Sequence, residues 1–426
     1  MLPLYRIFTD LAAWPLRIIL RLRAWRGKEE PLRLSERRGI TAASRPEGKL
    51  AWCHAASVGE AIALLPIVNH LLKDPAMNVL VTTGTVTSAR ILAERLPDRA
   101  IHQFAPWDRR AWVNRFLDLW RPDLALRMES ELWPNTLFAL RDRNISSIVV
   151  NGRLSEKTAR GWQRFSTTAR QVMASLDLVL AQSEEFADRF RAIGARRVEV
   201  TGNVKLAAAP LPVDIEAQRA LLQMMNARPV WLAASTHPGE EEIAFAAHSR
   251  LSKTVPDILT IIAPRHPDRG KAIAQSATRH GLRAACRSND EPIDRSTSIY
   301  VADTLGELGT LFSIAPIVFM GKSLAAHGGQ NPIEPCHFDC AILFGPNMEN
   351  FQDIAERMIK DGMALQINTD EALAETVVRL VSNADERKTL SDAAKNMTVS
   401  AQASVTKTNS AISDLLSRPT QRSGQA

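Results

Sequence analysis

The sequence predicts an α/β protein of two domains, each built on a parallel β-sheet with helices on both faces. A chain of 426 residues is too long for one ordinary core. Its content of 45% hydrophobic and 23% charged residues is typical of a globular protein. From about residue 48 onward, short β-rich runs alternate with stretches of helical periodicity, which is the pattern of strands joined by crossover helices.

The first 45 residues contain ten Lys or Arg and four Asp or Glu, so they account for +6 of the net charge of +7. Arg6, Asp10 and Arg17 interrupt the apolar residues, so the roughly 20 unbroken apolar residues of a confident span are missing. No cleavage site of small residues follows. We expect a basic amphipathic anchor helix on an anionic membrane surface. Two alternatives stay open, namely a helix packed on the protein's own core and a short membrane span within residues 1–28.

Because the remaining residues are nearly neutral, we expect no nucleic-acid partner.

The first domain, residues 46–208, contains runs that we expect to be strands, each followed by a stretch of helical periodicity. They are residues 49–55, 78–84, 99–104, 122–129, 146–152, 177–183 and 197–203. Small residues and two prolines within 205–216 indicate a linker. The pattern then restarts within residues 209–416. The runs there are residues 229–236, 257–264, 298–303, 315–321, 340–345 and 364–367. Residues 417–426 are polar, and we expect a flexible tail.

The cysteines do not predict a metal site. Cys53 and Cys286 are isolated in the sequence, and Cys336 and Cys340 have no second ligand pair at zinc-like spacing. We therefore expect four reduced thiols and no metal.

Polar side chains follow most of the expected strands, and α/β folds bind ligands at the carboxyl ends of parallel strands. Ser57 and Glu60 begin the helix after the first strand with the spacing of a capping box. At this edge Glu60 would also be placed to take a proton from an incoming hydroxyl. The two roles are compatible.

Glu129 and Glu131 end another strand, and we expect them to point the same way because residues two apart on an extended segment do so. Such a pair favours contact with a cation or with substrate hydroxyls, although a solvated loop is also consistent with it. Lys205 follows the last strand of the first domain and would neutralise a phosphate or carboxylate.

The second domain offers basic and hydroxyl groups at equivalent places. Residues 235–237 (Ser-Thr-His) precede a helix that opens with three glutamates, which indicates either an anion site with free backbone amides or simple capping. Arg265, His266 and Arg269 form a basic trio after the next strand, which suits a phosphate or carboxylate.

Residues 320–335 contain adjacent glycines and then Asn331 and Glu334. This is either a plain glycine-rich turn or a loop that admits a phosphate, with Glu334 gripping sugar hydroxyls. Gly306 and Glu307 lead into another helix. Together these clusters indicate an anionic, nucleotide-linked substrate in the second domain and a hydroxyl acceptor near Glu60, in a cleft between the domains.

The stretches SVGE, MESELWPN, NGRLSEKTARGW, TGNVK, ASTHPGEEE, PRHPDR, DTLGELG and GGQNPIEP occur in this order. With them the chain resembles, over nearly its whole length, the 3-deoxy-D-manno-octulosonic acid (Kdo) transferases of lipopolysaccharide assembly. The resemblance implies a GT-B fold of two Rossmann-like domains facing a cleft. It also implies inverting transfer of Kdo from CMP-Kdo without a metal or other cofactor. The implied acceptor is the lipid A precursor lipid IVA, at the cytoplasmic face of the cell inner membrane.

Carried over onto this sequence, the resemblance assigns Glu60 as the general base, and Glu129 and Lys205 as groups that support the transition state. The residues implied to hold CMP are Pro264, Arg265, Leu305, Gly306, Glu307, Asn331, Pro332, Ile333 and Glu334.

The chain departs from the family pattern at Lys322, where a second glycine is usual, and at Gln330, where a histidine is usual. Two alternatives remain open. One is a GT-B lipid glycosyltransferase that uses a UDP-sugar, and the other is a non-catalytic membrane-bound protein that binds a nucleotide sugar.

Overall fold

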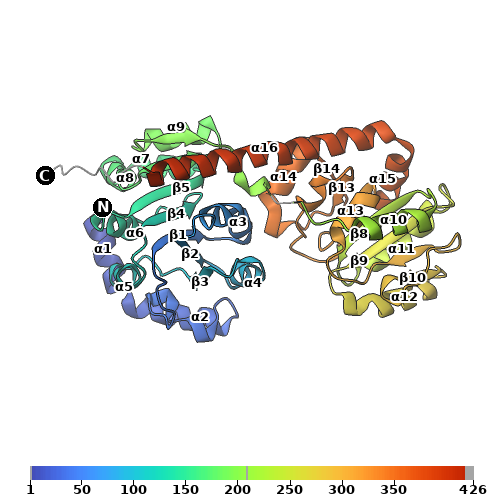
Figure 1. The fold of residues 1–426 in the computed structure, drawn as a ribbon, viewed down its shortest axis with the longest axis horizontal. Coiled ribbons are helices and arrows are strands. Elements are labelled where there is room, and N and C mark those ends of the chain that lie inside the picture. The colour runs from blue at the N-terminus through green and yellow to red at the C-terminus, as the bar shows by residue number, and fades with distance from the viewer. Residues whose placement is uncertain (1, 208–209, 418–426) are drawn as a thin grey trace. The chain divides into compact units, whose positions relative to one another are not determined.

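A computed structural model describes residues 2–207 and 210–417, which form two compact units (Figure 1). Among the described residues, unit 1 comprises residues 2–207 and 400–417, and unit 2 comprises residues 210–399. The sequence analysis placed residues up to 416 in the second domain, whereas residues 400–417 pack with unit 1. Apart from Ser417, the tail expected at 417–426 lies outside the described residues.

Unit 1 contains a seven-stranded sheet in the order β3-β2-β1-β4-β5-β6-β7, and every pairing is parallel. The strands are β1 (Lys49–Ala55), β2 (Met77–Thr83), β3 (Ala100–Phe104), β4 (Leu124–Met128), β5 (Ser146–Gly152), β6 (Leu178–Ala181) and β7 (Val198–Val200). The helices between them are α3 (Val58–Leu71), α4 (Val86–Arg95), α5 (Arg110–Trp120), α6 (Pro134–Asp142), α7 (Glu156–Gln163), α8 (Ser166–Met173) and α9 (Glu184–Ala192). All the strands expected in this half are present.

Successive side chains of β1 point to opposite faces of the sheet, and both faces are covered by helices. Leu50 and Trp52 pack against α5 through Phe116 and Trp120. The intervening residues point to the opposite face, and α3 also packs on β1. Burial on both faces explains why these strands read as continuous apolar runs.

Unit 2 repeats the plan with a second parallel sheet of seven strands in the order β10-β11-β9-β8-β12-β13-β14. The strands are β8 (Val230–Thr236), β9 (Leu259–Pro264), β10 (Ala284–Cys286), β11 (Ile299–Val301), β12 (Ile317–Met320), β13 (Ala341–Phe344) and β14 (Ala364–Gln366). The helices are α10 (Ile215–Met225), α11 (Glu240–Leu251), α12 (Gly270–Arg279), α13 (Leu308–Ile314), α14 (Gln352–Lys360) and α15 (Asp370–Ser382). Helix α16 (Ala384–Ser417) begins in unit 2, and its residues from Ser400 onward belong to unit 1. Two parallel-sheet α/β domains confirm the predicted fold class.

Short 3₁₀ helices complete the described chain. They are η1 (Pro31–Arg33), η2 (Glu36–Arg38), η3 (Val204–Leu206), η4 (Pro267–Arg269), η5 (Arg287–Asn289), η6 (Glu334–His337) and η7 (Glu349–Phe351).

The N-terminal segment forms two short helices, α1 (Leu2–Leu11) and α2 (Ala13–Trp25), of 10 and 13 residues. Within residues 2–207 and 210–417, no helix combines the length and the hydropathy needed to cross a membrane. Tyr5 Oη donates a hydrogen bond of 2.8 Å to Asp108, and Asp10 lies 3.2 Å from Arg110. These contacts attach α1 to unit 1.

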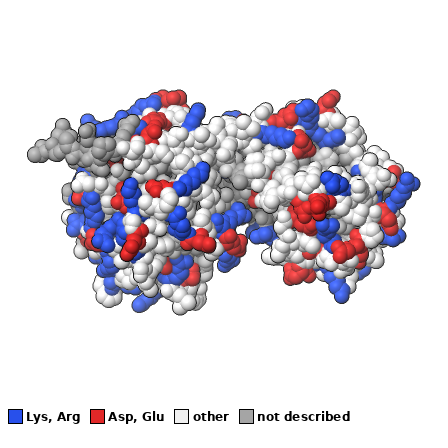
Figure 2. All heavy atoms as spheres, in the orientation of Figure 1, with Lys and Arg blue, Asp and Glu red and all other residues white. Residues whose placement is uncertain are grey.

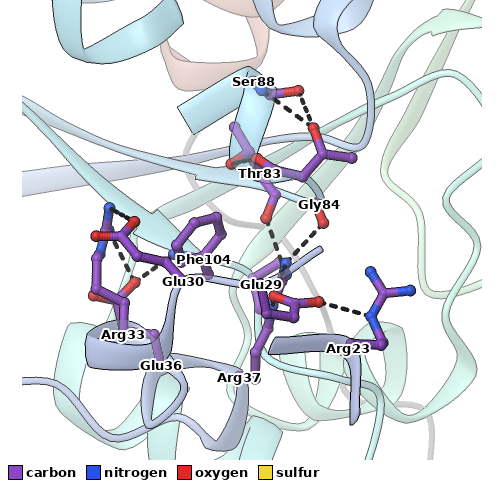
Figure 3. Close-up of polar contacts among 12 residues, drawn as sticks. Arg23, Glu29, Glu30, Arg33, Glu36, Arg37, Thr83, Gly84, Ser88 and Phe104 are labelled. Atoms are coloured by element: carbon purple, nitrogen blue, oxygen red, sulfur yellow. Dashed lines mark hydrogen bonds and ion pairs between the residues drawn. The ribbon is translucent and has the colours of Figure 1, made fainter. Parts of the chain in front are cut away.

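A buried polar network attaches the segment after α2 to the sheet (Figure 3). The carboxylate of Glu29 accepts hydrogen bonds of 2.9 Å from Arg23 and from Arg37. The Arg37 guanidinium also donates to the carbonyl oxygens of Thr83, at 3.1 Å, and Gly84, at 2.7 Å. Residues 29–37 therefore cap carbonyl groups at the carboxyl end of β2.

On the face drawn in Figure 2, lysine and arginine side chains are interspersed with acidic ones over both units. The basic excess is therefore not gathered into a single patch on that face.

Candidate functional site

The sheet topology marks one edge in each unit where ligands are expected. The strand order reverses between β1 and β4 in unit 1 and between β8 and β12 in unit 2. Open α/β sheets bind ligands outside the carboxyl ends of the strands at such a switch point. The candidate residues Glu60 and Glu129 follow β1 and β4. Lys205 lies in η3, which packs on α3.

Glu60 caps α3 and is nearly buried. Its backbone N–H donates to Ser57 Oγ at 3.3 Å, and Ser57 Oγ donates to the Glu60 carboxylate at 2.8 Å. The backbone N–H of Ala56 donates to the second carboxylate oxygen at 2.9 Å. The predicted capping role is present, and the carboxylate is held in one orientation.

Glu60, Glu129 and Lys205 form one electrostatic cluster. Lys205 Nζ lies 2.5 Å from Glu129 Oε1, and both side chains are mostly buried. Burial raises the pKa of Glu60, and the nearby charge of Glu129 raises it further, whereas the hydrogen bonds from Ala56 and Ser57 and the charge of Lys205 act in the opposite direction. A carboxylate with a raised pKa is a stronger general base than an ordinary glutamate.

The expectation that Glu129 and Glu131 point the same way from an extended segment is wrong. Strand β4 ends at Met128, and Glu129 has a left-handed φ of 58°. Glu129 therefore turns toward Lys205, while the backbone oxygen of Glu131 accepts a hydrogen bond of 3.1 Å from Arg127. A left-handed backbone costs a non-glycine residue roughly 1–2 kcal/mol, and such strain is often found at functional sites.

Arg127 supports this turn through its hydrogen bond to the backbone of Glu131. The sequence analysis did not select this residue. Its side chain is buried on β4, with the guanidinium 5.2 Å from the ring centre of Trp52 and 5.7 Å from that of Trp133. Burial lowers the pKa of His54 on the adjacent strand to about 3, and the charge of Arg127 contributes to the shift. The sequence feature that could have identified Arg127 is its position as a single arginine inside an apolar run.

The basic trio of unit 2 does not stay together. Arg269 is engaged by the buried carboxylate of Glu241, with contacts of 2.7 and 3.0 Å. Arg265 and His266 are exposed after β9. Only these two members of the trio therefore remain available to an anion at this edge.

Of the two interpretations of the segment after β8, the contacts of Glu240 favour capping. Glu240, the first residue of α11, is 1% exposed. Its carboxylate accepts a hydrogen bond of 3.0 Å from the N–H of His237 and others from the loop after β12. Glu240 therefore occupies one of the backbone donors after β8, that of His237.

The remaining candidate residues lie on two loops of unit 2. Leu305 is 80% exposed, and Gly306 has a φ of 83°. Glu307 lies 2.8 Å from Arg287 and also accepts a hydrogen bond from Thr304. Burial alone would raise the pKa of Glu307, but these contacts outweigh it and lower that pKa.

Residues 331–334 form a compact turn that leads into η6. Asn331 Nδ2 donates to Glu334 at 3.2 Å, and Asn331 Oδ1 accepts from the N–H of Ile333 at 3.2 Å. Pro332 and Ile333 are buried beneath the turn. Glu334 is therefore held at a fixed position near the glycine-rich loop.

The cysteine pair near η6 is engaged within the protein. The buried thiols of Cys336 and Cys340 donate to the carbonyl oxygens of Pro332 and Pro335, each at 3.3 Å. Within the described ranges, no three or more His, Cys, Asp or Glu side chains form a group that could hold a metal ion.

Comparison with solved structures relates the chain to other two-domain α/β proteins. The UDP-GlcNAc 2-epimerase of Neisseria meningitidis is 14% identical and matches with a TM-score of 0.50 over 85% of this chain and 100% of that one, which is a likeness of fold alone. The C-terminal CMP-Kdo binding domain of WaaA from Acinetobacter baumannii is 26% identical, with a TM-score of 0.41, over 43% of this chain and 96% of that one.

Sequence comparison relates the chain to one family. A family model described as 3-deoxy-D-manno-octulosonic-acid transferase (kdotransferase) matches residues 32–208. A 3-deoxy-D-manno-octulosonic acid transferase of Rickettsia bellii is 36% identical over 374 residues, which are 87% of this chain and 88% of that protein. The extent of this match shows that the chain belongs to the 3-deoxy-D-manno-octulosonic acid transferases, a family of glycosyltransferases.

Proposed function

We propose that this protein transfers Kdo from CMP-Kdo to lipid IVA at the cytoplasmic face of the inner membrane, with inversion and without a metal or other cofactor. The observation that carries the proposal is the cluster of Glu60, Glu129 and Lys205 at the switch point of unit 1.

In the proposed reaction, Glu60 takes the proton from the acceptor hydroxyl as its oxygen attacks the anomeric carbon of Kdo. The bond from that carbon to the phosphate oxygen breaks, and CMP leaves with the electron pair. Glu129 and Lys205 support the transition state by placing opposite charges beside the reacting centre. The raised pKa of Glu60 and its fixed orientation support its role as the base.

The donor is assigned to the loops of unit 2. Exposed Arg265 suits the phosphate, because a guanidinium offers paired donors to anionic oxygens. The exposed side chain of Leu305 offers an apolar surface to the pyrimidine. Glu334 is assigned to the ribose hydroxyls. Pro264, Gly306 and Glu307, with residues 331–333, shape the same surface.

We infer that α1 and α2 lie on the membrane that holds the acceptor. Large apolar side chains are exposed on both helices, including Phe8 at 72%, Trp14 at 73% and Trp25 at 82%. Exposed basic residues accompany them, among them Arg17 and Arg21. Tryptophan with arginine on one short amphipathic segment suits the interface of an anionic bilayer.

The test is to incubate the purified protein with lipid IVA and either CMP-Kdo, generated in place, or UDP-N-acetylglucosamine, followed by mass spectrometry of the lipid. A mass gain of one or more Kdo units with CMP-Kdo alone supports the proposal, and the size of the gain gives the number of units added. A gain with the UDP-sugar alone supports the rival GT-B enzyme. Donor binding without a mass gain supports the non-catalytic alternative.

A further inference from the structure

The loop after β12 is rich in glycine, but it does not offer a set of free amides to a ligand. The Glu240 carboxylate accepts the N–H groups of Lys322, Ser323 and Leu324 at 2.6, 2.9 and 3.1 Å. Gly328 N–H donates to Glu349 at 2.7 Å. These four amides are therefore not available to an anion, which leaves the side chains of the loop as binding groups there.

The backbone farther along the loop is engaged in the same way. Gly329 N–H donates to the carbonyl oxygen of Lys322 at 2.7 Å, and Gln330 N–H donates to that of Gly321 at 3.2 Å. The loop is thus a rigid support for its side chains.

Lys322 stands out among those side chains. It lies two residues beyond β12, at the switch point of unit 2, and it is partly exposed. Among residues 2–207 and 210–417, its ammonium group has no hydrogen-bond or ion-pair partner. An ammonium group without a protein partner, at the edge where α/β sheets bind ligands, is free to bind an anion.

The backbone of Lys322 is strained. Its φ of 58° lies in the left-handed region, where glycine is favoured. Among the described residues no ion pair of its side chain offsets this cost. Strain of this kind at the edge of a site points to a role in binding.

The side chain of Lys322 is directed by its neighbours. A Cβ on Gly328 would lie 3.3 Å from Lys322 Cε, so the absence of a side chain at Gly328 leaves room for the lysine stem. Two histidines lie nearby, with their rings, those of His237 and His266, 6.0 Å apart. Burial lowers the pKa of His237, and the charge of Lys322 contributes to this shift. The Glu240 carboxylate lies against the backbone of His237 and of Lys322, but among the described residues it forms no ion pair with the lysine ammonium.

We propose that the Lys322 ammonium binds an anionic group of the sugar nucleotide, either its phosphate or the carboxylate of its sugar. The proposal rests on the proposed function, because it takes CMP-Kdo as the donor. It adds a contact at a position where the resemblance leads us to expect glycine.

The test compares the full-length protein with Lys322→Met, which keeps most of the stem, and with Lys322→Arg. Binding of CMP and of cytidine is measured by calorimetry, and KM is measured for CMP-Kdo. Lys271→Met, at an exposed lysine on α12, is the matched control. We expect Lys322→Met to weaken a phosphate contact about tenfold or more, and Lys322→Arg to retain most of the affinity. Cytidine, which carries no anion, should bind all variants alike.

Weaker binding of CMP assigns Lys322 to the phosphate. Unchanged binding of CMP with a raised KM for CMP-Kdo assigns it to the carboxylate. If neither value differs between Lys322→Met and Lys271→Met, the inference is wrong. Failure of the wild-type protein to bind CMP or to transfer Kdo would instead count against the proposed function.

A second variant separates strain from binding. Lys322→Gly should raise the melting temperature, because glycine adopts the left-handed backbone without strain, while it weakens donor binding as Lys322→Met does. A Lys322→Gly protein that binds the donor as well as the wild type would overturn the proposal, even if it is more stable.

Discussion

At the scale of the residue, Glu60 combines a structural and a chemical property at one position. Its hydrogen bonds with Ser57 and Ala56 hold the start of α3, and its burial raises its pKa. The S-x-x-E spacing allowed the cap to be predicted from the sequence. The neighbouring charges could not be predicted in the same way, because Glu129 and Lys205 reach the site from distant parts of the chain.

The first prediction concerns pH. We expect kcat/KM to fall as the pH is lowered through the pKa of Glu60, because only the ionised carboxylate accepts a proton. Since the charge of Glu129 raises this pKa, Glu129→Gln should move the acidic limb of the profile to lower pH. Since the charge of Lys205 lowers it, Lys205→Met should move the limb to higher pH.

The measurement is the pH profile of the residual kcat/KM of each variant. Glu156→Gln, at an exposed glutamate on α7, is the control and should leave the limb unchanged. A limb that moves to higher pH in Glu129→Gln, or to lower pH in Lys205→Met, would contradict the electrostatic cluster.

At the scale of the element, most strands could be predicted because a strand buried on both faces is a continuous apolar run. Strand β10 was missed, since its three residues are Ala-Ala-Cys at the edge of the sheet. The hydrogen bonds of Glu240 to the loop after β12 could not be predicted from the sequence either. The helix-start pattern around it was visible, but its bonding partner Lys322 lies 82 residues farther along.

Glu240→Gln tests the support of the glycine-rich loop. A neutral side chain would exchange charge-assisted hydrogen bonds for weaker ones and place an amide donor against backbone donors. We expect faster hydrogen exchange of the amides at 322–324, read by mass spectrometry. Glu242→Gln, at the exposed neighbour, should leave their exchange unchanged. Equal exchange in the two variants would contradict the role assigned to Glu240.

The buried network around Arg37 makes a prediction for stability. Arg37→Ala leaves the buried Glu29 with Arg23 as its one remaining partner in the network, and it removes donors from the carbonyl oxygens of Thr83 and Gly84 (Figure 3). Breaking a buried pair in this way costs about 3–5 kcal/mol. Arg141→Ala, at an exposed ion pair with Asp142, should cost less than about 1 kcal/mol.

Calorimetry of both variants measures the difference as a lowered melting temperature. If Arg37→Ala melts at the same temperature as Arg141→Ala, the network does not hold the N-terminal segment to the sheet.

At the scale of the whole molecule, each unit is a parallel sheet with one switch point, and the candidate residues lie after the carboxyl ends of its strands. Glu60 and Glu129 follow the two strands that flank the switch point of unit 1, and residues 331–334 follow β12 at that of unit 2. This arrangement could be predicted from the sequence because the polar clusters follow the apolar runs. The proposed membrane contact of α1 and α2 rests on the large apolar side chains that are exposed on both helices.

Vesicle binding tests that role. We expect Trp14→Ser with Trp25→Ser to weaken binding to vesicles that contain anionic lipid by at least roughly tenfold, because two large side chains no longer enter the interface. Phe165→Ser, at an exposed aromatic residue elsewhere in unit 1, is the control. Binding that is unchanged by the tryptophan substitutions, or is equal on neutral vesicles, would contradict the proposed membrane contact.

The most direct test of the central claim is the mass of lipid IVA after incubation with CMP-Kdo and the wild-type, Glu60→Gln or Glu156→Gln protein. We predict a gain of one or more Kdo units with the wild type and with Glu156→Gln, and a loss of that gain with Glu60→Gln. Transfer by Glu60→Gln at the wild-type rate would contradict the assignment of the base. No gain with any of the three, where a known transferase gives one, would contradict the proposed reaction itself.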